Sequence, residues 1–234
     1  MSELSRGPLI RVGHKGAAHV APGNTIESFQ AALEHGVDMI EFDVLKTRDG
    51  RLVLAHDGED AAGRKPLTLQ EGLDHFAGEA YSGVELDVDL KLPGYEREVV
   101  EGLLERSLGN RSLVSSMFTE SLDRLGELAP GLRRGWSVPR IKRNWMRSPF
   151  AVPAYAVVRV MRARLPGEAA ARIRAGGCEA IMANRFLASH RLVRAVHDAD
   201  GMLYVWTVDD PARIQALERM GVDGVITNDP RLFW

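Results

Sequence analysis

Several features that would decide the class of a protein are scarce in this sequence. Among its 234 residues the single cysteine, Cys178, excludes an internal disulfide and fits a reducing compartment. No run approaches the roughly 18 apolar residues of a membrane-spanning helix. Residues 1–11 lack the basic start and apolar stretch of a secretory signal, so we expect a cytoplasmic protein. The formal net charge is only −2, which gives no global reason to expect a nucleic-acid partner.

What the sequence does have is an ordinary globular composition, with 45% hydrophobic and 26% charged residues. Strand-like and helix-like segments alternate about eight times without a break in composition, a pattern typical of parallel strands joined by crossover helices. A (β/α)8 TIM barrel typically needs about 250 residues and sometimes nearer 200. We therefore predict an α/β TIM barrel that occupies residues 1–234 as a single domain.

Apolar runs and turn residues place the expected elements along the chain. The eight barrel strands are expected over residues 9–12, 39–45, 84–90, 113–116, 132–136, 180–183, 202–207 and 224–227. Helices are expected from Asn24 or Thr25 to about Gly36, and over 69–76, 95–107, 120–128, 189–199 and 211–220. The turn at Asp49–Gly50 predicts an extra strand over 52–55, and a loop should follow over 58–66. Residues 138–175 predict one or two helices.

Polar residues gather where the expected strands end, and in a TIM barrel that rim carries the functional residues. Glu41 and Asp43 are two positions apart on one strand, so both side chains point into the barrel. Two neighbouring carboxylates repel unless a cation lies between them or one is protonated. Asp89 offers a third oxygen from the neighbouring strand. Ligation by oxygen alone favours Mg²⁺ or Ca²⁺ over zinc.

Histidines and lysines share this rim with the carboxylates. His14 and His56 follow strands and suit acid and base roles, while Lys15 and Lys91 supply positive charge for an anionic substrate. A divalent cation, two basic residues and a histidine pair together suit phosphoryl transfer better than carbonyl chemistry. Asp87 either supports the metal from behind or pairs with a lysine.

The ordered set of motifs resembles the glycerophosphodiester phosphodiesterase family, and the resemblance spans nearly the whole chain. The matching pieces are H-K-G at 14–16, A-P-G-N-T at 21–25, E-F-D at 41–43, T-R-D-G at 47–50, H-D at 56–57, D-L-K at 89–91, W-T-V at 206–208 and D-G-V-I-T-N-D-P at 223–230. This family consists of metal-dependent barrels that cleave glycerophosphodiesters to glycerol 3-phosphate and an alcohol. The resemblance therefore implies a hydrolase of lipid and glycerol metabolism with a small-molecule substrate.

The resemblance also implies roles for individual residues. The catalytic pair falls on His14 and His56, one taking a proton from the attacking oxygen and the other protonating the leaving alkoxide. The sequence leaves open which does which. The remaining implied roles are metal ligation by Glu41, Asp43 and Asp89, phosphate binding by Lys15 and Lys91, and a glycerol contact by Trp206.

Three positions depart from the family pattern: Lys15 replaces an arginine, Asp89 replaces a glutamate, and Gly23 replaces the glutamate of P-E-N-T. Lysine is a flexible point charge rather than a planar fork, so the charge survives but phosphate binding weakens. The family often inserts a small subdomain after the second strand, and here only residues 58–66 remain. A more open site favours one alternative, lysophospholipase D-like activity on lysophospholipids. The departures keep another open, a catalytically weak phosphodiester-binding barrel.

Residues 133–174 form a strongly basic segment with a single acid, Glu168, and many apolar neighbours. One interpretation is a solvated helix face, as charge runs usually are. The other is an amphipathic patch that contacts anionic lipid, which would make the protein peripheral at the inner membrane face. The basic residues are Arg133, Arg134, Arg140, Lys142, Arg143, Arg147, Arg159, Arg162, Arg164, Arg172 and Arg174.

Overall fold

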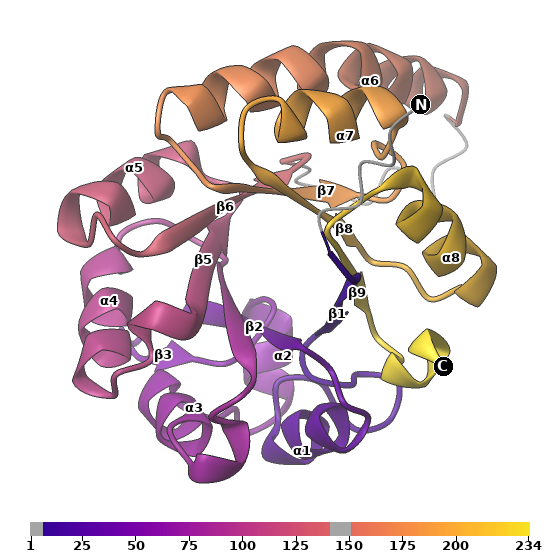
Figure 1. Cartoon of the computed structure of the whole chain (residues 1–234). Coiled ribbons are helices and arrows are strands. Elements are labelled where there is room, and N and C mark those ends of the chain that lie inside the picture. Colours follow the sequence, from indigo (N-terminus) through magenta and orange to yellow (C-terminus); the bar gives the residue numbers. More distant parts are fainter. Residues whose placement is uncertain (1–6, 141–150) are drawn as a thin grey trace.

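A closed barrel of eight parallel strands, surrounded by helices, forms the body of the molecule (Figure 1). The computed structural model describes residues 7–140 and 151–234. Pairing of β1 with both β2 and β9 closes the barrel. The barrel strands are β1 (Ile10–Gly13), β2 (Met39–Lys46), β4 (Glu85–Leu90), β5 (Ser112–Ser116), β6 (Arg133–Val138), β7 (Ala180–Asn184), β8 (Met202–Trp206) and β9 (Gly224–Thr227).

The crossover connections carry one main helix each, as right-handed βαβ units require. These helices are α1 (Ile26–Glu34), α3 (Leu69–Phe76), α4 (Glu96–Glu105), α5 (Thr119–Leu128), α6 (Ala151–Arg174), α7 (His190–His197) and α8 (Pro211–Met220). Short 3-10 turns lie at Glu79–Tyr81, Gly109–Arg111 and Pro230–Phe233. The predicted fold class and the order of the elements are therefore confirmed.

The segment after β2 differs from the expectation. The extra strand is β3 (Leu52–Val53), which is only two residues long and runs antiparallel to β2. The predicted loop over 58–66 is wrong, because Gly58–Gly63 forms a short helix, α2. The carboxylate of Asp57 caps α2 by accepting hydrogen bonds from the amides of Glu59 and Asp60. No residue of α2 is buried, so the sequence had no apolar periodicity there to indicate a helix.

Two apolar layers hold the barrel together. Outward-facing residues of the strands pack against the helices, as Phe42 does against Phe29 and Phe76 with ring centroids 6.2 and 5.0 Å away. Burying each such ring contributes about 1.5–3 kcal/mol. Inside the barrel a second cluster includes Met39 and Tyr204. This inner cluster gives way to polar side chains toward the carboxyl ends of the strands, where the site lies.

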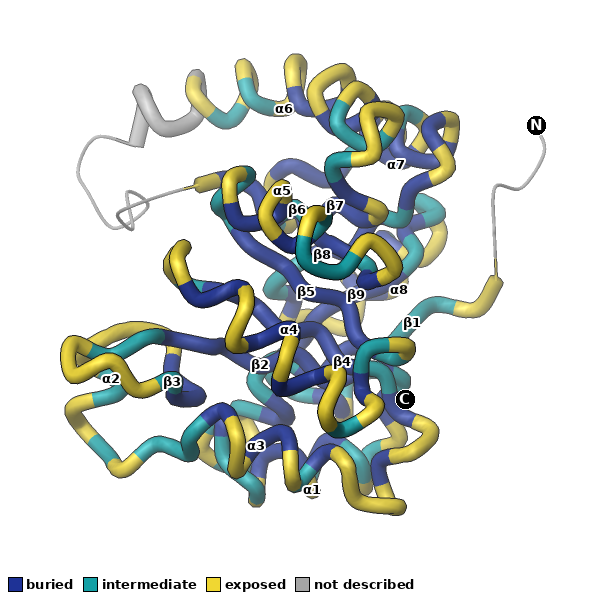
Figure 2. Tube along the Cα trace, turned by 90° about the vertical axis from the view of Figure 1, so that its left-hand side faces the viewer, coloured by how far each residue is buried: buried dark blue, intermediate teal, exposed yellow. Residues whose placement is uncertain are grey.

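The segment 138–175, for which one or two helices were expected, contains one described helix, α6, and residues 141–150 lie outside the described part. Figure 2 shows that α6 extends past the strand ends on the side where β3 and α2 lie. Within the described residues, no helix is both long and apolar enough to span a membrane.

Candidate active site

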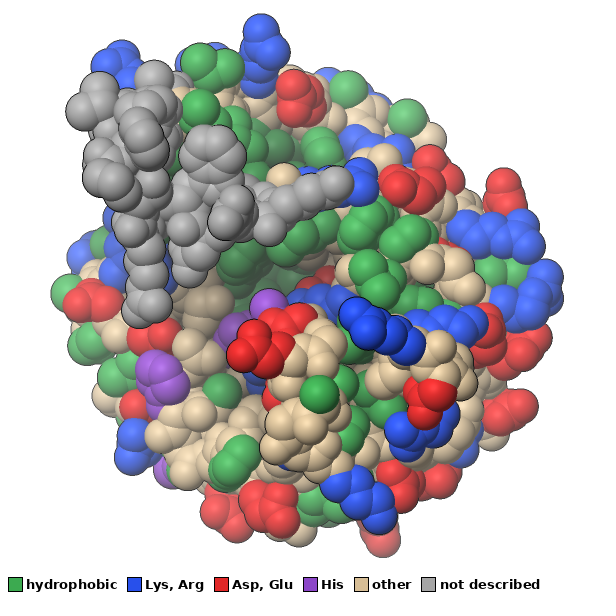
Figure 3. Space-filling model, turned by 180° about the vertical axis from the view of Figure 1, so that it is seen from behind, with side chains coloured by type: hydrophobic (Ala, Val, Ile, Leu, Met, Phe, Trp, Pro, Cys, Tyr) green, Lys and Arg blue, Asp and Glu red, His purple; other side chains and the backbone are tan. Residues whose placement is uncertain are grey.

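The candidate site is a pocket of about 170 Å³ at the carboxyl ends of the strands. Figure 3 looks onto this face, where histidine and acidic side chains gather near the centre. A larger hollow of about 530 Å³ lies at the opposite end of the barrel, and its lining lacks histidine and lysine. The first pocket is lined by His14, Glu41, His56, Asp87, Asp89, Lys91, Ser115, Met117, Ser137, Met182, Trp206, Thr207 and Ile226.

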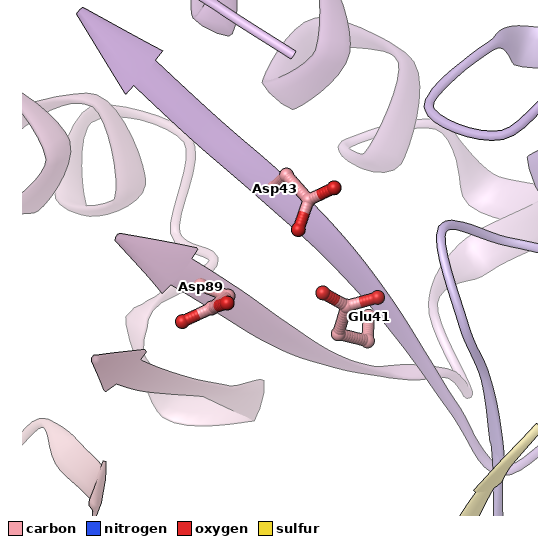
Figure 4. A group of neighbouring side chains, drawn as sticks. All are labelled: Glu41, Asp43 and Asp89. Carbon is pink, nitrogen blue, oxygen red and sulfur yellow. The ribbon is translucent and has the colours of Figure 1, made fainter. Parts of the chain in front are cut away.

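Three carboxylates converge at the pocket, Glu41 and Asp43 from β2 and Asp89 from β4 (Figure 4). One oxygen from each lies within 4.8 Å of the others. The residues are only 4, 0 and 9% exposed. The parallel register of β2 and β4 sets Asp43 beside Asp89, which is why residues 46 positions apart meet here. This donor set consists only of oxygen and fits Mg²⁺ or Ca²⁺.

The electrostatics of the cluster show that it attracts positive charge. Burial acts to raise the pKa of Asp43, but the ammonium groups of Lys91 and Lys15 outweigh it and hold that pKa well below its usual range. Burial and the charge of Asp43 raise the pKa of Glu41 well above its usual value. Burial acts to lower the pKa of Lys91, but the carboxylates of Asp43 and Asp89 outweigh it and hold that pKa well above its usual value. Lys91 therefore stays protonated.

Both predicted phosphate-binding lysines point at these carboxylates. The Lys91 ammonium forms ion pairs with Asp43 and with Asp89, the latter at 2.5 Å, and so stands where a cation would neutralise them. Lys15 Nζ lies 3.5 Å from Asp43 Oδ2. A side chain at Gly23 would place its Cβ only 2.9 Å from Lys15 Cβ, so the glycine leaves room for the lysine stem.

Asn24 positions Asp43, a role that the sequence reasoning missed. Its Nδ2 donates to Asp43 Oδ2 at 2.9 Å, and its Oδ1 accepts from the Asp43 amide at 3.0 Å. Both residues are fully buried. The sequence suggested Asn24 only as a possible helix cap, but Thr25 caps α1. The available signal was the A-P-G-N-T motif itself.

His14 belongs to a hydrogen-bonded chain that reaches across the junction of β1 and β9. Asn228 Nδ2 donates to Asp209 Oδ2 at 2.7 Å, and because a carboxylate only accepts, this fixes the orientation of the amide. Asn228 Oδ1 then faces His14 Nδ1 at 2.6 Å and can only accept, so Nδ1 carries the proton. The neutral ring consequently keeps its lone pair on Nε2, which lies 3.8 Å from Glu41 Oε2. Burial lowers the pKa of His14 to about 4, so the ring is neutral near pH 7.

His56 reaches the same pocket from the turn after β3 and is more exposed than His14. Its side chain is 52% exposed, against 21% for His14. His56 Nδ1 lies 3.1 Å from Asp57 Oδ2, and its backbone amide donates to Asp60 Oδ2 at 3.0 Å. The structure therefore brings the two predicted catalytic histidines into one pocket in different environments.

Trp206 and Asp87 complete the lining. Trp206 Nε1 donates to the Met182 carbonyl at 2.7 Å, which holds the indole in the pocket wall. Asp87 is 1% exposed, and burial raises its pKa to about 8. Among the described residues no lysine forms an ion pair with Asp87, and its Oδ1 has no hydrogen-bond partner. Of the two expectations for Asp87, the lysine pair is therefore wrong.

Comparison with known proteins agrees with this geometry. The model of the glycerophosphoryl diester phosphodiesterase family matches residues 14–65 and 68–232. The glycerophosphodiester phosphodiesterase of Caldanaerobacter subterraneus subsp. tengcongensis is 28% identical, over 94% of this chain and 93% of that protein. The glycerophosphodiester phosphodiesterase of Bacillus subtilis strain 168 is 27% identical, over 98% of this chain and 87% of its own.

Solved structures share the fold. The glycerophosphodiester phosphodiesterase of Agrobacterium tumefaciens superposes with a TM-score of 0.68 at 21% identity and covers 97% of this chain and 99% of its own. An Oleispira antarctica phosphodiesterase, solved with its product sn-glycerol-3-phosphate, superposes with a TM-score of 0.70 at 21% identity. The match covers 96% of this chain and 94% of the Oleispira chain. With the family model matching nearly the whole chain, this protein belongs to the glycerophosphoryl diester phosphodiesterase family.

Proposed function

We propose that this protein hydrolyses glycerophosphodiesters to sn-glycerol 3-phosphate and an alcohol, with the help of a divalent cation. The observation that carries the proposal is that three buried carboxylates, two histidines and two lysines meet at one pocket of a family member, with Asp43 and Lys15 directly behind its lining. Curated relatives carry the name of this activity, and the Oleispira neighbour was solved with the same product.

Glu41, Asp43 and Asp89 are the residues that would hold the cation, Mg²⁺ or Ca²⁺. When bound, it supplies positive charge that neutralises the phosphodiester and the charge that develops on it. Lys91 and Lys15, which compensate the carboxylates in this structure, would with the cation bound be available to pair with the phosphate oxygens. The indole of Trp206 forms the apolar wall against which the glycerol carbons pack.

The environments of the histidines favour distinct roles. His14 acts as the base, because Asn228 fixes the proton on Nδ1 and leaves the Nε2 lone pair free to accept one. The proton comes from the attacking oxygen, either water, which gives glycerol 3-phosphate directly, or the neighbouring glycerol hydroxyl, which gives a cyclic phosphodiester that water then opens with the two histidine roles reversed. His56, at the more open side and beside the Asp57 carboxylate, protonates the leaving alkoxide. Such positioned acid and base groups each accelerate reactions about 10²–10⁴-fold.

A second candidate activity is cleavage of lysophospholipids by the same chemistry. The segment between β2 and α3 contains only β3 and the six-residue helix α2, which leaves the mouth of the pocket open to an acyl-bearing alcohol. The third candidate, a weak binding barrel, is disfavoured because binding alone requires neither a histidine base nor a second histidine. The expected cytoplasmic location stays a prediction.

The test is hydrolysis of glycerophosphocholine, with glycerol 3-phosphate detected enzymatically, after chelation and then with Mg²⁺ or Ca²⁺ restored. We expect product only with a cation, and we expect His14→Ala and His56→Ala each to lower kcat about 10²–10⁴-fold. His190→Ala is the matched control, because His190 is exposed on α7. Near-normal turnover in both site variants would overturn the histidine scheme. Activity on lysophospholipid but not on glycerophosphocholine would favour the second candidate.

A further inference from the structure

Helix α6 is much longer than the other helices of the ring. Its 24 residues span about 36 Å, whereas the 8 to 10 residues of α3, α4, α5, α7 and α8 span about 12–15 Å. Because α6 connects the carboxyl end of β6 to the start of β7, it runs from the active-site rim toward the opposite end. Its last ten residues, 165–174, match the other helices in length, so the preceding residues, called the projecting part below, are extra length at the rim end of the helix (Figure 2).

The projecting part carries apolar side chains on its outer face. Val157 and Val160 are 57 and 52% exposed. At 100° per residue they share the outward stripe with Arg164 and Glu168. The buried residues Leu165, Pro166, Ala169 and Ala170 occupy the arc between about 80° and 220° from Val157, which faces the barrel. The outer stripe thus changes along the helix from apolar at Val157 and Val160 to charged at Arg164 and Glu168.

Exposed large apolar side chains concentrate at the same end of the molecule. Of the seven in the described residues, five lie at the rim: Val20, Leu92, Val157, Val160 and Phe186. The other two, Leu104 and Trp234, lie at the opposite end. Single exposed apolar residues are normal on any protein, so the informative feature is their gathering around the active-site mouth.

The charges of the basic segment that the structure describes divide between the two ends of the barrel, and Lys142, Arg143 and Arg147 lie outside the described residues. At the end away from the active site, Arg133 pairs with Glu85 and Arg134 with Glu179, while Arg172 pairs with Asp123 between α6 and α5. The projecting part of α6 keeps three further cations, Arg159, Arg162 and Arg164, and residues 157–167 contain no acid. Arg162 is partly engaged, since its Nη2 donates to the Ala188 carbonyl at 3.1 Å.

We propose that the projecting part of α6, through Val157, Val160, Arg159 and Arg164, docks the active-site rim onto an anionic lipid surface. The two valines enter the interface between headgroups and acyl chains, while the arginines bind the lipid phosphates and carboxylates. A second copy of this chain is a poor occupant, because two such helices would bring six arginines together against only the two Glu168 carboxylates. Docking through α6 keeps the rim and the pocket mouth close to the lipid surface, where lipid-derived phosphodiesters are found, and only that consequence rests on the proposed function.

The test is flotation of the full chain with vesicles of phosphatidylcholine alone or mixed with phosphatidylserine. We expect the wild type to float with the mixed vesicles and much less with phosphatidylcholine. The double variant Val157→Asp/Val160→Asp should lose this binding, and Arg159→Gln/Arg164→Gln should weaken it about 25-fold, at about fivefold per arginine. Leu104→Asp is the matched control, since Leu104 is 58% exposed at the opposite end and its replacement should leave flotation unchanged.

Three results would overturn the proposal. The first is that the wild type does not float with anionic vesicles. The second is that Leu104→Asp and the valine variant lose flotation equally. The third is that, without vesicles, the molecular mass of the wild type rises with protein concentration and the valine variant abolishes this rise. The last would identify α6 as a self-association surface instead. Flotation needs no turnover, so its outcome is independent of the proposed activity. Unchanged circular dichroism and unchanged hydrolysis of glycerophosphocholine by the variants confirm that their folds are intact.

Discussion

Replacing Asn24 with glycine tests whether a buried amide holds the cation site in shape. Asn24 has a φ of 60°, a left-handed conformation that glycine adopts without strain. The substitution therefore removes the side chain without straining the backbone. Alanine would add a backbone penalty of about 1–2 kcal/mol and confuse the result. Asn24→Gly therefore reports the loss of the two contacts with Asp43.

The expected loss of stability follows from those contacts. The hydrogen bond from Nδ2 to the Asp43 carboxylate involves a charged acceptor and contributes about 1.5–3 kcal/mol. The bond from the Asp43 amide to Oδ1 is neutral and contributes about 0.5–1.5 kcal/mol. Together they predict a fall of about 2–4.5 kcal/mol in the free energy of unfolding, a large share of the roughly 5–15 kcal/mol typical of a domain.

Urea denaturation followed by tryptophan fluorescence measures this fall, and calorimetric titration with Mg²⁺ or Ca²⁺ measures the site. We expect cation affinity to drop about 10–100-fold, as for other residues that orient a metal ligand. Ser107→Gly is the matched control, because Ser107 has a φ of 56° and is exposed far from the pocket. That control should shift stability by no more than about 1 kcal/mol. An Asn24→Gly protein as stable as Ser107→Gly, with unchanged cation affinity, would refute the reasoning.

Two further predictions concern His14. Asn228→Ala should lower kcat about 10–100-fold with little change in KM, because the His14 ring loses the acceptor that fixes its proton on Nδ1. An altered pH–rate profile separates this effect from a purely structural one, and an unaltered kcat would contradict the prediction. Because burial lowers the pKa of His14 to about 4 from 6.5, the unfolded chain takes up this proton first as the pH falls. The chelated wild type should therefore lose stability relative to His14→Asn between pH 6.5 and about 4, in urea titrations at each pH, and a constant difference would contradict the shift.

Most of the architecture and the meeting of the three carboxylates could be predicted from the sequence, because both follow from periodicity. Alternation along β2 sets Glu41 and Asp43 on one face, and parallel register with β4 adds Asp89. What escaped depends on partners that no local pattern reveals. Asn228 meets His14 across 214 positions only because β9 pairs with β1 to close the barrel. The same holds for the basic segment. Two of its arginines, Arg133 and Arg172, pair with Glu85 on β4 and Asp123 on α5, which lie outside the segment in sequence.

The structure also changes how two of the departures from the family pattern are understood. From the sequence, Lys15 and Gly23 are separate losses, a weaker phosphate clamp and a missing carboxylate. In the fold they are neighbours, and any side chain at position 23 would begin 2.9 Å from the Cβ of Lys15. Lys15 itself has a φ of 53°, so its backbone directs the stem across the glycine and brings Nζ to 3.5 Å from Asp43. The glycine thus allows the lysine to reach the carboxylate cluster, and the two substitutions act as one adjustment of the same corner of the site.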